Sequence, residues 1–273
     1  MCIRDRCPVA ARTLVGAPTT LVAMSDSTDT TPTTPTASDR VYFRQLLAGR
    51  DFAKNDPIAR QMVNFVYAIG DRETGEAVLV DPAYAPNELV DVLEADDMTL
   101  TGALVTHYHP DHCGGDMMGH GIAGVRELLE RVDVPVHIQA DEEEWLRIVT
   151  EVPESQLRTH TSGDVVMVGE VAVRLIHTPG HTPGSQCFLA DGKLIAGDTL
   201  FLEGCGRTDL PGGDPAALYE SLTQRLANIS DDTVLFPGHM YSAEPSAPMG
   251  ETRKHNFVFA PRNATEWMGM FGR

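Results

Sequence analysis

Three histidines and an aspartate stand within six consecutive residues, at His107, His109, Asp111 and His112. Neutral imidazole nitrogens and carboxylate oxygens are ligands that zinc, iron, manganese and cobalt accept. The apolar run at residues 100–105 leads into this motif and predicts a strand that ends there. If the strand continues, His107 and His109 point to the same side, whereas Pro110 turns the chain before the later pair. The spacing therefore predicts one metal position for the first pair and a neighbouring position for the second pair.

Two metal ions need more ligands than this motif holds, and three further candidates occur later in the chain. These candidates are His181, Asp198 and His239. Each follows an apolar run and is flanked by glycine or proline, so each is expected in a loop at the end of a strand.

The order His-x-His-x-Asp-His, then a distant His, an Asp and a final His resembles the metallo-β-lactamase-fold hydrolases. The resemblance covers about residues 64–256 and includes every element of the motif in order. It implies an α/β fold, the four-layer αβ/βα sandwich of two mixed β-sheets flanked by helices. In that fold the metals lie at one edge, between the two sheets.

Carried over position by position, the resemblance implies a ligand set for two divalent metal ions. The first ion would be held by His107, His109 and His181, the second by Asp111, His112 and His239, and Asp198 would bridge them. Zinc is the first choice, with iron or manganese as alternatives. A metal-bridging hydroxide would attack a carbonyl carbon, and Asp111 would act as the catalytic residue that accepts its proton. A purely structural metal site is the alternative, but such sites favour closed, thiolate-rich shells.

The loop after Asp198 indicates the substrate class. Its Gly-Cys-Gly-Arg sequence looks like the corresponding loop of the glyoxalase II thioesterases and the persulfide dioxygenases, which both act on glutathione derivatives. In the thioesterases a basic residue at the place of Arg207 and an aromatic residue two positions later hold the glutathione carboxylate, whereas Asp209 occupies the second position here. Tyr241 matches the thioesterases' Gly-His-x-Tyr. The resemblance thus implies that Arg207 and Tyr241 bind substrate, with a loop-fixing ion pair as the alternative for Arg207.

Two functions follow from the resemblance. The first is a metal-dependent hydrolase acting on a thioester or related acyl substrate, similar to glyoxalase II. The second is a mononuclear iron persulfide dioxygenase acting on glutathione persulfide, with one iron held by His107, His181 and Asp198. In both cases the partner is a small molecule, with a glutathione derivative as a candidate, and the oligomeric state is left open.

The amino-acid composition restricts the expected binding partners and cellular location. The formal net charge of −18, from 39 acidic and 21 basic residues, argues against nucleic acid or an anionic membrane as partner. Five cysteines without metal-type C-x-x-C spacing do not predict a disulfide framework, so a cytoplasmic location is expected. A secretory signal near the start is the alternative, but Gly16 and Pro18 interrupt its apolar segment. Cys205 is expected to pack rather than to act as a nucleophile.

The chain divides into an extension and one domain. Residues 1–40 are expected to be disordered because residues 25–38 are rich in serine, threonine, proline and aspartate. Met24 is an alternative start. Residues 41–273 are expected to form a single metallo-β-lactamase-fold domain.

Within that domain the patterns predict a β-rich half followed by helices, and then a second such half. The expected elements are hairpin strands at 63–68 and 77–80, a helix at 85–95, a strand at 100–105, helices at 121–132 and 141–150 around a strand at 134–138, hairpins around Gly169 and Gly192, a helix at 215–227 and a strand at 234–236. The acidic run at residues 141–144 is interpreted as a solvated first helical turn. His177 is expected to pack beside the site, and the remaining histidines are expected to be surface or satisfied residues at 120, 137, 160 and 255.

Overall fold

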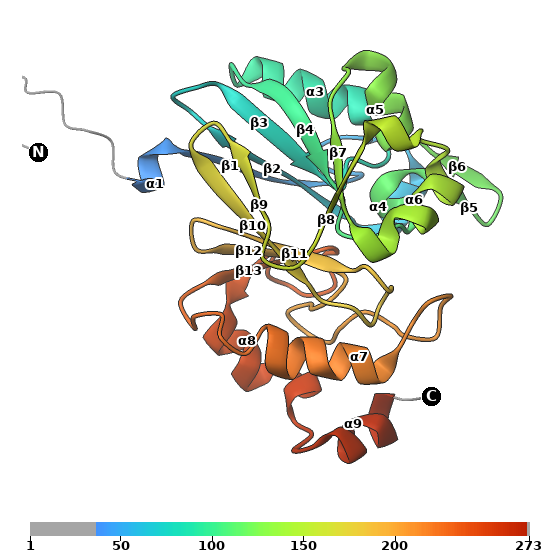
Figure 1. The fold of residues 1–273 in the computed structure, drawn as a ribbon, viewed down its shortest axis with the longest axis vertical. Helices are drawn as coiled ribbons and strands as arrows, with labels where there is room; N and C mark the ends of the chain where they lie inside the picture. The colour runs from blue at the N-terminus through green and yellow to red at the C-terminus, as the bar shows by residue number, and fades with distance from the viewer. Residues whose placement is uncertain (1–36, 272–273) are drawn as a thin grey trace, which may run out of the picture. The chain divides into compact units, whose positions relative to one another are not determined.

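A computed structural model describes residues 37–271, and two six-stranded sheets form the centre of this part of the chain (Figure 1). The strands of the first sheet, in sheet order, are β1 (Val41–Leu47), β2 (Phe65–Asp71), β3 (Glu76–Val80), β4 (Thr99–Leu104), β7 (Val136–Gln139) and β8 (Leu157–His160). Strands β1 to β3 pair antiparallel, and β3, β4, β7 and β8 pair parallel, so the sheet is mixed. Residues 1–36 of the expected extension lie outside the described residues.

The second sheet is also mixed. Its strands, in sheet order, are β14 (Ala247–Pro248), β13 (Val234–Pro237), β12 (Lys193–Gly197), β11 (Gln186–Ala190), β10 (Val171–His177) and β9 (Val165–Val168). Only β12 and β13 pair parallel; the other pairs in this sheet are antiparallel. A separate two-stranded hairpin consists of β5 (Gly115–Met117) and β6 (His120–Ile122).

Helices cover the outer face of each sheet (Figure 1). The α-helices are α1 (Ala37–Arg40), α2 (Pro57–Met62), α3 (Pro86–Ala95), α4 (Pro110–Cys113), α5 (Val125–Arg131), α6 (Glu143–Thr150), α7 (Pro215–Glu220), α8 (Met249–His255) and α9 (Ala264–Phe271). Short 3-10 turns occur at η1 (Ala140–Glu142), η2 (Glu154–Gln156) and η4 (Phe257–Phe259), and η3 (Ser221–Arg225) is a π-helical turn. Within residues 37–271 no helix has both the length and the apolar character needed to cross a membrane.

Three layers of buried apolar side chains hold these elements together. Between the sheets, Tyr67 and Val78 of the first sheet share a cluster with Val173 and Phe188 of the second. Residues 171–175 of β10 alternate between buried and exposed because only one face of this part of the strand meets the cluster, whereas β2 is buried along its whole length. The outer clusters pack α3, α5 and α6 on the first sheet and α7, α8 and α9 on the second. The expected four-layer αβ/βα sandwich is confirmed.

The predicted helix at residues 121–132 is wrong in its first turn. Residues up to Ile122 belong to β6, and α5 begins only at Val125. A Cβ atom on Gly124 would lie 2.1 Å from the carbonyl oxygen of Cys113, so the chain packs backbone to backbone before the helix starts. Apolar spacing alone does not detect such a contact.

The predicted helix at residues 215–227 is regular only in its first half. Asp214 caps α7, since its Oδ1 accepts hydrogen bonds from the backbone N–H groups of Ala216 and Ala217. Beyond Glu220 the helix widens into the π-helical turn η3.

Candidate metal centre

The loop after β4 carries the first four candidate ligands. It is held to both sheets, because Val105 N–H donates to the carbonyl oxygen of His137 over 3.0 Å and Gln186 N–H donates to that of Thr106 over 3.0 Å. Pro110 occupies the first turn of α4, a position where its missing N–H costs no hydrogen bond. This short helix turns Asp111 and His112 away from the extended segment before it, and both side chains are buried.

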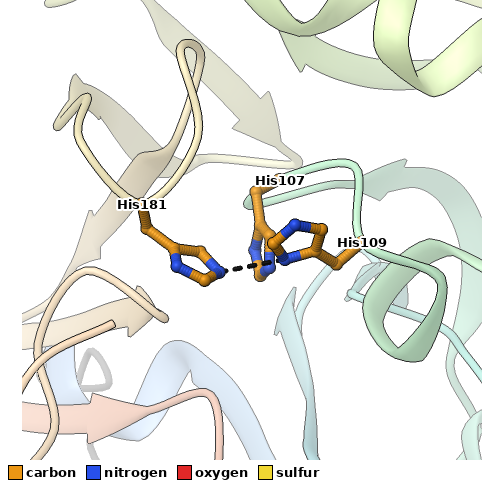
Figure 2. Close-up of side chains that lie close together, drawn as sticks. All are labelled: His107, His109 and His181. Carbon is orange, nitrogen blue, oxygen red and sulfur yellow. Dashed lines mark hydrogen bonds between the residues drawn. The ribbon is translucent and has the colours of Figure 1, made fainter. Parts of the chain in front are cut away.

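His107, His109 and His181 form the first group of candidate ligands (Figure 2). One nitrogen of each ring lies within 4.8 Å of one nitrogen of the other two. His181 follows β10, and its Nε2 lies 2.9 Å from Nδ1 of His109. The first group therefore combines side chains delivered by both sheets.

Asp111, His112 and His239 form the second group, again with candidate ligand atoms within 4.8 Å of one another. His239 follows β13, and its Nε2 lies 3.3 Å from Nε2 of His112 and 3.5 Å from Oδ2 of Asp111. The residue before it has to be glycine, because a Cβ atom on Gly238 would lie 2.3 Å from Oδ1 of Asp198.

Asp198 lies between the two groups. Its Oδ1 is 3.4 Å from Nε2 of His112, whereas its Oδ2 is 3.3 Å from Nε2 of His239 and 3.6 Å from Nε2 of His181. The carboxylate comes directly after β12, at the point where Gly197 has φ of +48°. One side chain thus contacts members of both groups.

Outer hydrogen bonds orient two of the rings through one carboxylate. His112 donates from Nδ1 to Oδ2 of Asp81 over 2.9 Å. The hydroxyl of Thr106 donates to the same oxygen over 2.6 Å and accepts from Nδ1 of His107 over 3.0 Å. Because Nδ1 carries the proton in both rings, each Nε2 presents a lone pair toward the centre.

Backbone carbonyls orient two more rings in the same way. His181 donates from Nδ1 to the carbonyl oxygen of Arg207 over 2.7 Å, and His239 donates from Nδ1 to that of Met62 over 2.8 Å. Their Nε2 atoms are likewise left as acceptors that point inward.

The donor atoms of these seven side chains are suited to bind metal cations. Nε2 of His107 and Oδ1 of Asp198 are buried and have no hydrogen-bond partner among the described residues. Buried polar atoms of a folded chain almost always have a partner, so such atoms need another explanation. The facing nitrogens of His109 and His181 also need a proton or a cation between them. Imidazole and carboxylate donors are those that first-row divalent metals accept.

The ionisation states of the buried side chains also favour cation binding. Burial and the neighbouring imidazoles lower the pKa of His107 well below its usual range. For Asp198, burial acts upward, but His239 and His112 hold the pKa well below the usual range. Burial acts downward on His112, but the nearby aspartates outweigh it and raise its pKa to about 10. In the metal-free site this ring therefore carries a second proton on Nε2, and a cation would displace that proton to reach the lone pair. The buried carboxylates are therefore ionised and attract positive charge into the centre.

The two predicted substrate-binding residues lie at the rim. The ring of Tyr241 stacks on that of His239 with 4.6 Å between centroids, and its side chain is exposed. Arg207 has a 63% exposed side chain that donates from Nε and Nη2 to the two carboxylate oxygens of Asp209 over 2.7 and 2.6 Å. The ion pair that the sequence left as an alternative is thus present, alongside the backbone contact of Arg207 with His181.

Three buried polar residues beside the site were missed in the sequence. Asp81 was interpreted only as the end of a strand, yet it orients two rings. Asn64 donates from Nδ2 to Asp111 over 3.1 Å and is 1% exposed. Glu142 belongs to the acidic run interpreted as solvated, and that interpretation is wrong for this residue because it is 0% exposed. For Asn64 and Asp81 the available signal was a polar residue directly next to a strand, whereas Glu142 carries no such signal.

The chain is similar to proteins of one known superfamily. Residues 60–239 match the metallo-beta-lactamase superfamily. A hydroxyacylglutathione hydrolase from Methylobacillus flagellatus is 32% identical over 212 residues, which are 77% of this chain and 75% of the relative. The mitochondrial persulfide dioxygenase ETHE1 of Homo sapiens is 30% identical over 200 residues, 70% of each chain.

A solved structure is similar over most of the fold. The crystal structure of ETHE1 from Myxococcus xanthus has a TM-score of 0.70 and 28% identity, and the match covers 85% of this chain and 90% of that one. Together with the match over residues 60–239, the comparisons establish that the chain belongs to the metallo-beta-lactamase superfamily.

Proposed function

We propose that the protein is a metal-dependent hydrolase of thioesters or related acyl compounds, similar to glyoxalase II. The observation that carries the proposal is the position of Asp198, whose carboxylate contacts His181 on one side and His112 on the other. Two complete ligand groups joined by one carboxylate are the arrangement that two-metal hydrolysis requires.

In this proposal seven side chains bind the two metal ions. His107, His109 and His181 would hold the first divalent ion, and Asp111, His112 and His239 would hold the second. Asp198, which contacts members of both groups, would be a ligand shared between them. When bound, such ions supply a hydroxide near neutral pH and polarise a carbonyl oxygen. Zinc is the first choice for both ions.

Asp111 is the proposed proton acceptor. Its side chain is close to His239 and is held by the amide of Asn64, which donates to Oδ2 over 3.1 Å. That bond leaves Oδ1 available to take a proton, and it fixes the plane of the carboxylate. Orientation of a base in this way is a large part of its catalytic value.

The substrate is proposed to be a small anionic thioester, with a glutathione derivative as the candidate. Similarity to hydroxyacylglutathione hydrolase supports this choice. Tyr241 offers an exposed aromatic ring beside His239, and Arg207 offers a guanidinium on the loop that also positions His181. A planar guanidinium suits a carboxylate, although Asp209 must release or share it.

The second candidate is a mononuclear iron persulfide dioxygenase. Its support is the similarity to persulfide dioxygenase ETHE1 in sequence and in structure. One iron would then be held by His107, His181 and Asp198, two imidazoles and one carboxylate with open positions for dioxygen.

Metal analysis of the purified protein combined with two assays separates these candidates. The first assay is hydrolysis of S-lactoylglutathione, and the second is oxygen uptake in the presence of glutathione persulfide. Two metal ions per chain with thioester hydrolysis are the expected result. One iron per chain with oxygen uptake and no hydrolysis would replace the first proposal by the second.

A further inference from the structure

Glu142 is a buried carboxylate that no part of the proposed chemistry uses. It ends η1, the short turn between β7 and α6, and its side chain is fully buried. An ionised carboxylate in such a place is costly unless donors surround it. Burial raises the pKa of Glu142, and hydrogen bonds from Thr182, Tyr108 and Gly184 act in the opposite direction, leaving it at about 7.

The donors come from the two loops that carry the first ligand group. Oε1 of Glu142 accepts from the backbone N–H of Tyr108 over 2.8 Å and from the hydroxyl of Thr182 over 2.7 Å. Oε2 accepts from the backbone N–H of Gly184 over 2.6 Å. Tyr108 stands between His107 and His109 in the chain, and Thr182 directly follows His181. A single oxygen atom therefore links both loops one residue away from their ligands.

The surroundings fit a carboxylate in particular. Both oxygens meet only donors in these contacts, so the group has to be an acceptor on both sides. An amide in its place would turn an NH₂ group toward at least one donor. The neighbouring backbone is shaped around the side chain as well, because a Cβ atom on Gly184 would lie 2.5 Å from Cβ of Glu142.

We infer that Glu142 is a positioning residue for the first metal ion: its carboxylate fixes the loop of His107 and His109 against the loop of His181. The inference rests on the proposed metal-dependent function and adds a residue outside the ligand set. Without the link, each loop keeps its own sheet contacts, but the distance between the ring nitrogens of His109 and His181, 2.9 Å here, loses the restraint that Glu142 provides. Substitution of a residue that forms hydrogen bonds to metal ligands or their loops commonly lowers metal affinity by about ten- to a hundredfold.

The test measures each centre separately. In a His112→Ala background only the first group is complete, and in a His181→Ala background only the second group is complete. Glu142→Gln is introduced into both, and Zn²⁺ and Co²⁺ affinities are measured by competition with a chromophoric chelator. We expect a loss of about ten- to a hundredfold in the His112→Ala background and less than about a twofold change in the His181→Ala background. The absorption spectrum of bound Co²⁺ should change in the first background alone.

Asp71→Asn is the matched control. Asp71 is also fully buried, and it accepts backbone N–H bonds from Glu73 and Glu170 over 2.9 and 2.8 Å, but it lies at the end of β2 away from the site. This variant should lower the unfolding temperature and leave both affinities unchanged. If Glu142→Gln behaves like Asp71→Asn, the carboxylate only supports the fold and the inference is overturned.

A second variant covers the case in which Glu142→Gln does not fold. Thr182→Val removes one of the three hydrogen bonds and keeps the two backbone donors in place. It should weaken the first centre by a smaller factor, about threefold to tenfold, and spare the second. Unchanged first-centre affinity in Thr182→Val would also overturn the inference. If the wild-type chain binds no metal, both the proposed function and the inference are refuted. If the wild-type chain binds metal and the variants have the same metal affinities, only the inference is refuted.

Discussion

The amide of Asn64 donates from Nδ2 to Oδ2 of Asp111 over 3.1 Å. A second hydrogen bond, on the other side of this amide, fixes its orientation. The hydroxyl of Tyr84 donates to Oδ1 of Asn64 over 2.9 Å, so the carbonyl end of the amide points to the tyrosine and the NH₂ end to the aspartate. These two hydrogen bonds connect Tyr84, which lies between β3 and α3, to the second ligand group through Asn64.

Asn64→Ala is expected to weaken the second metal centre by about tenfold, because Asp111 loses the bond that sets its plane. The affinity should be measured in the His181→Ala background, where the second group alone is complete. Tyr84→Phe removes only the outer bond and should cost less than Asn64→Ala. Equal losses in the His112→Ala background would contradict a specific effect on Asp111.

Asp198→Ala should remove more metal than His112→Ala. Asp198 contacts members of both groups, and its loss also leaves two cations facing each other with less neutralisation. His112→Ala should leave the first ion bound. Metal content per chain after gel filtration checks this, and the same complete loss in both variants would argue against two centres.

Arg207→Ala is expected to raise KM for an anionic thioester by about tenfold, or about 1.4 kcal/mol, with little change for a neutral thioester. Alanine keeps the backbone carbonyl that accepts from His181, so the ring stays oriented. Asp209→Asn is the matched control: it weakens the ion pair that holds the guanidinium and should lower KM for the anionic substrate. If both substrates suffer equally in Arg207→Ala, the side chain fixes the loop and does not bind the anion.

The stability of the metal-free chain should fall as the pH drops below the usual histidine range, partly because of His137. Burial, and then His160 and Arg158, lower the pKa of His137 to about 4, and its Nδ1 lies 2.8 Å from Nε2 of His160. Between pH 6.5 and 4 the unfolded chain binds a proton that the folded chain excludes, so unfolding is favoured by about 2 kcal/mol at pH 5. Urea unfolding at pH 7 and pH 5 should show a smaller pH dependence in His137→Gln. An unchanged pH dependence would show that His137 does not contribute.

A chain that begins at Ala37 should retain the metal content and unfolding temperature of the full chain, because it keeps Arg40 and β1. A chain that begins at Val41 should be less stable. It lacks the Arg40 guanidinium, which donates to both carboxylate oxygens of Asp71, so that carboxylate loses its charged partner. Thermal unfolding of both shortened chains distinguishes the two boundaries, and loss of folding from the Ala37 start would show that the preceding residues are required.

The sequence alone predicted those residues of the candidate site that lie in a loop directly after a strand. His107, His181, Asp198 and His239 each follow a strand, and glycine or proline near each of them indicates the loop. The topology came from the family resemblance, because local patterns do not determine which strands become neighbours.

The residues that the sequence missed act over long separations. Glu142 looks like any acidic residue at the start of a helix, and its burial depends on Thr182 and Gly184 folding over it. The start of α5 was misplaced for a similar reason, since Gly124 packs against Cys113 rather than following its own helix. Contacts of this kind are a property of the assembled sheets and leave no periodic pattern in the chain.

The first ligand group draws its members from both sheets, so a bound ion would be a cross-link across the sandwich. Separation of the sheets then requires release of the ion, and the free metal concentration adds to the stability of the closed form by mass action. At a hundred times the Kd this amounts to about 2.7 kcal/mol, or about a hundredfold fewer opening events. We therefore expect proteolysis of the native chain to slow as the free metal concentration rises.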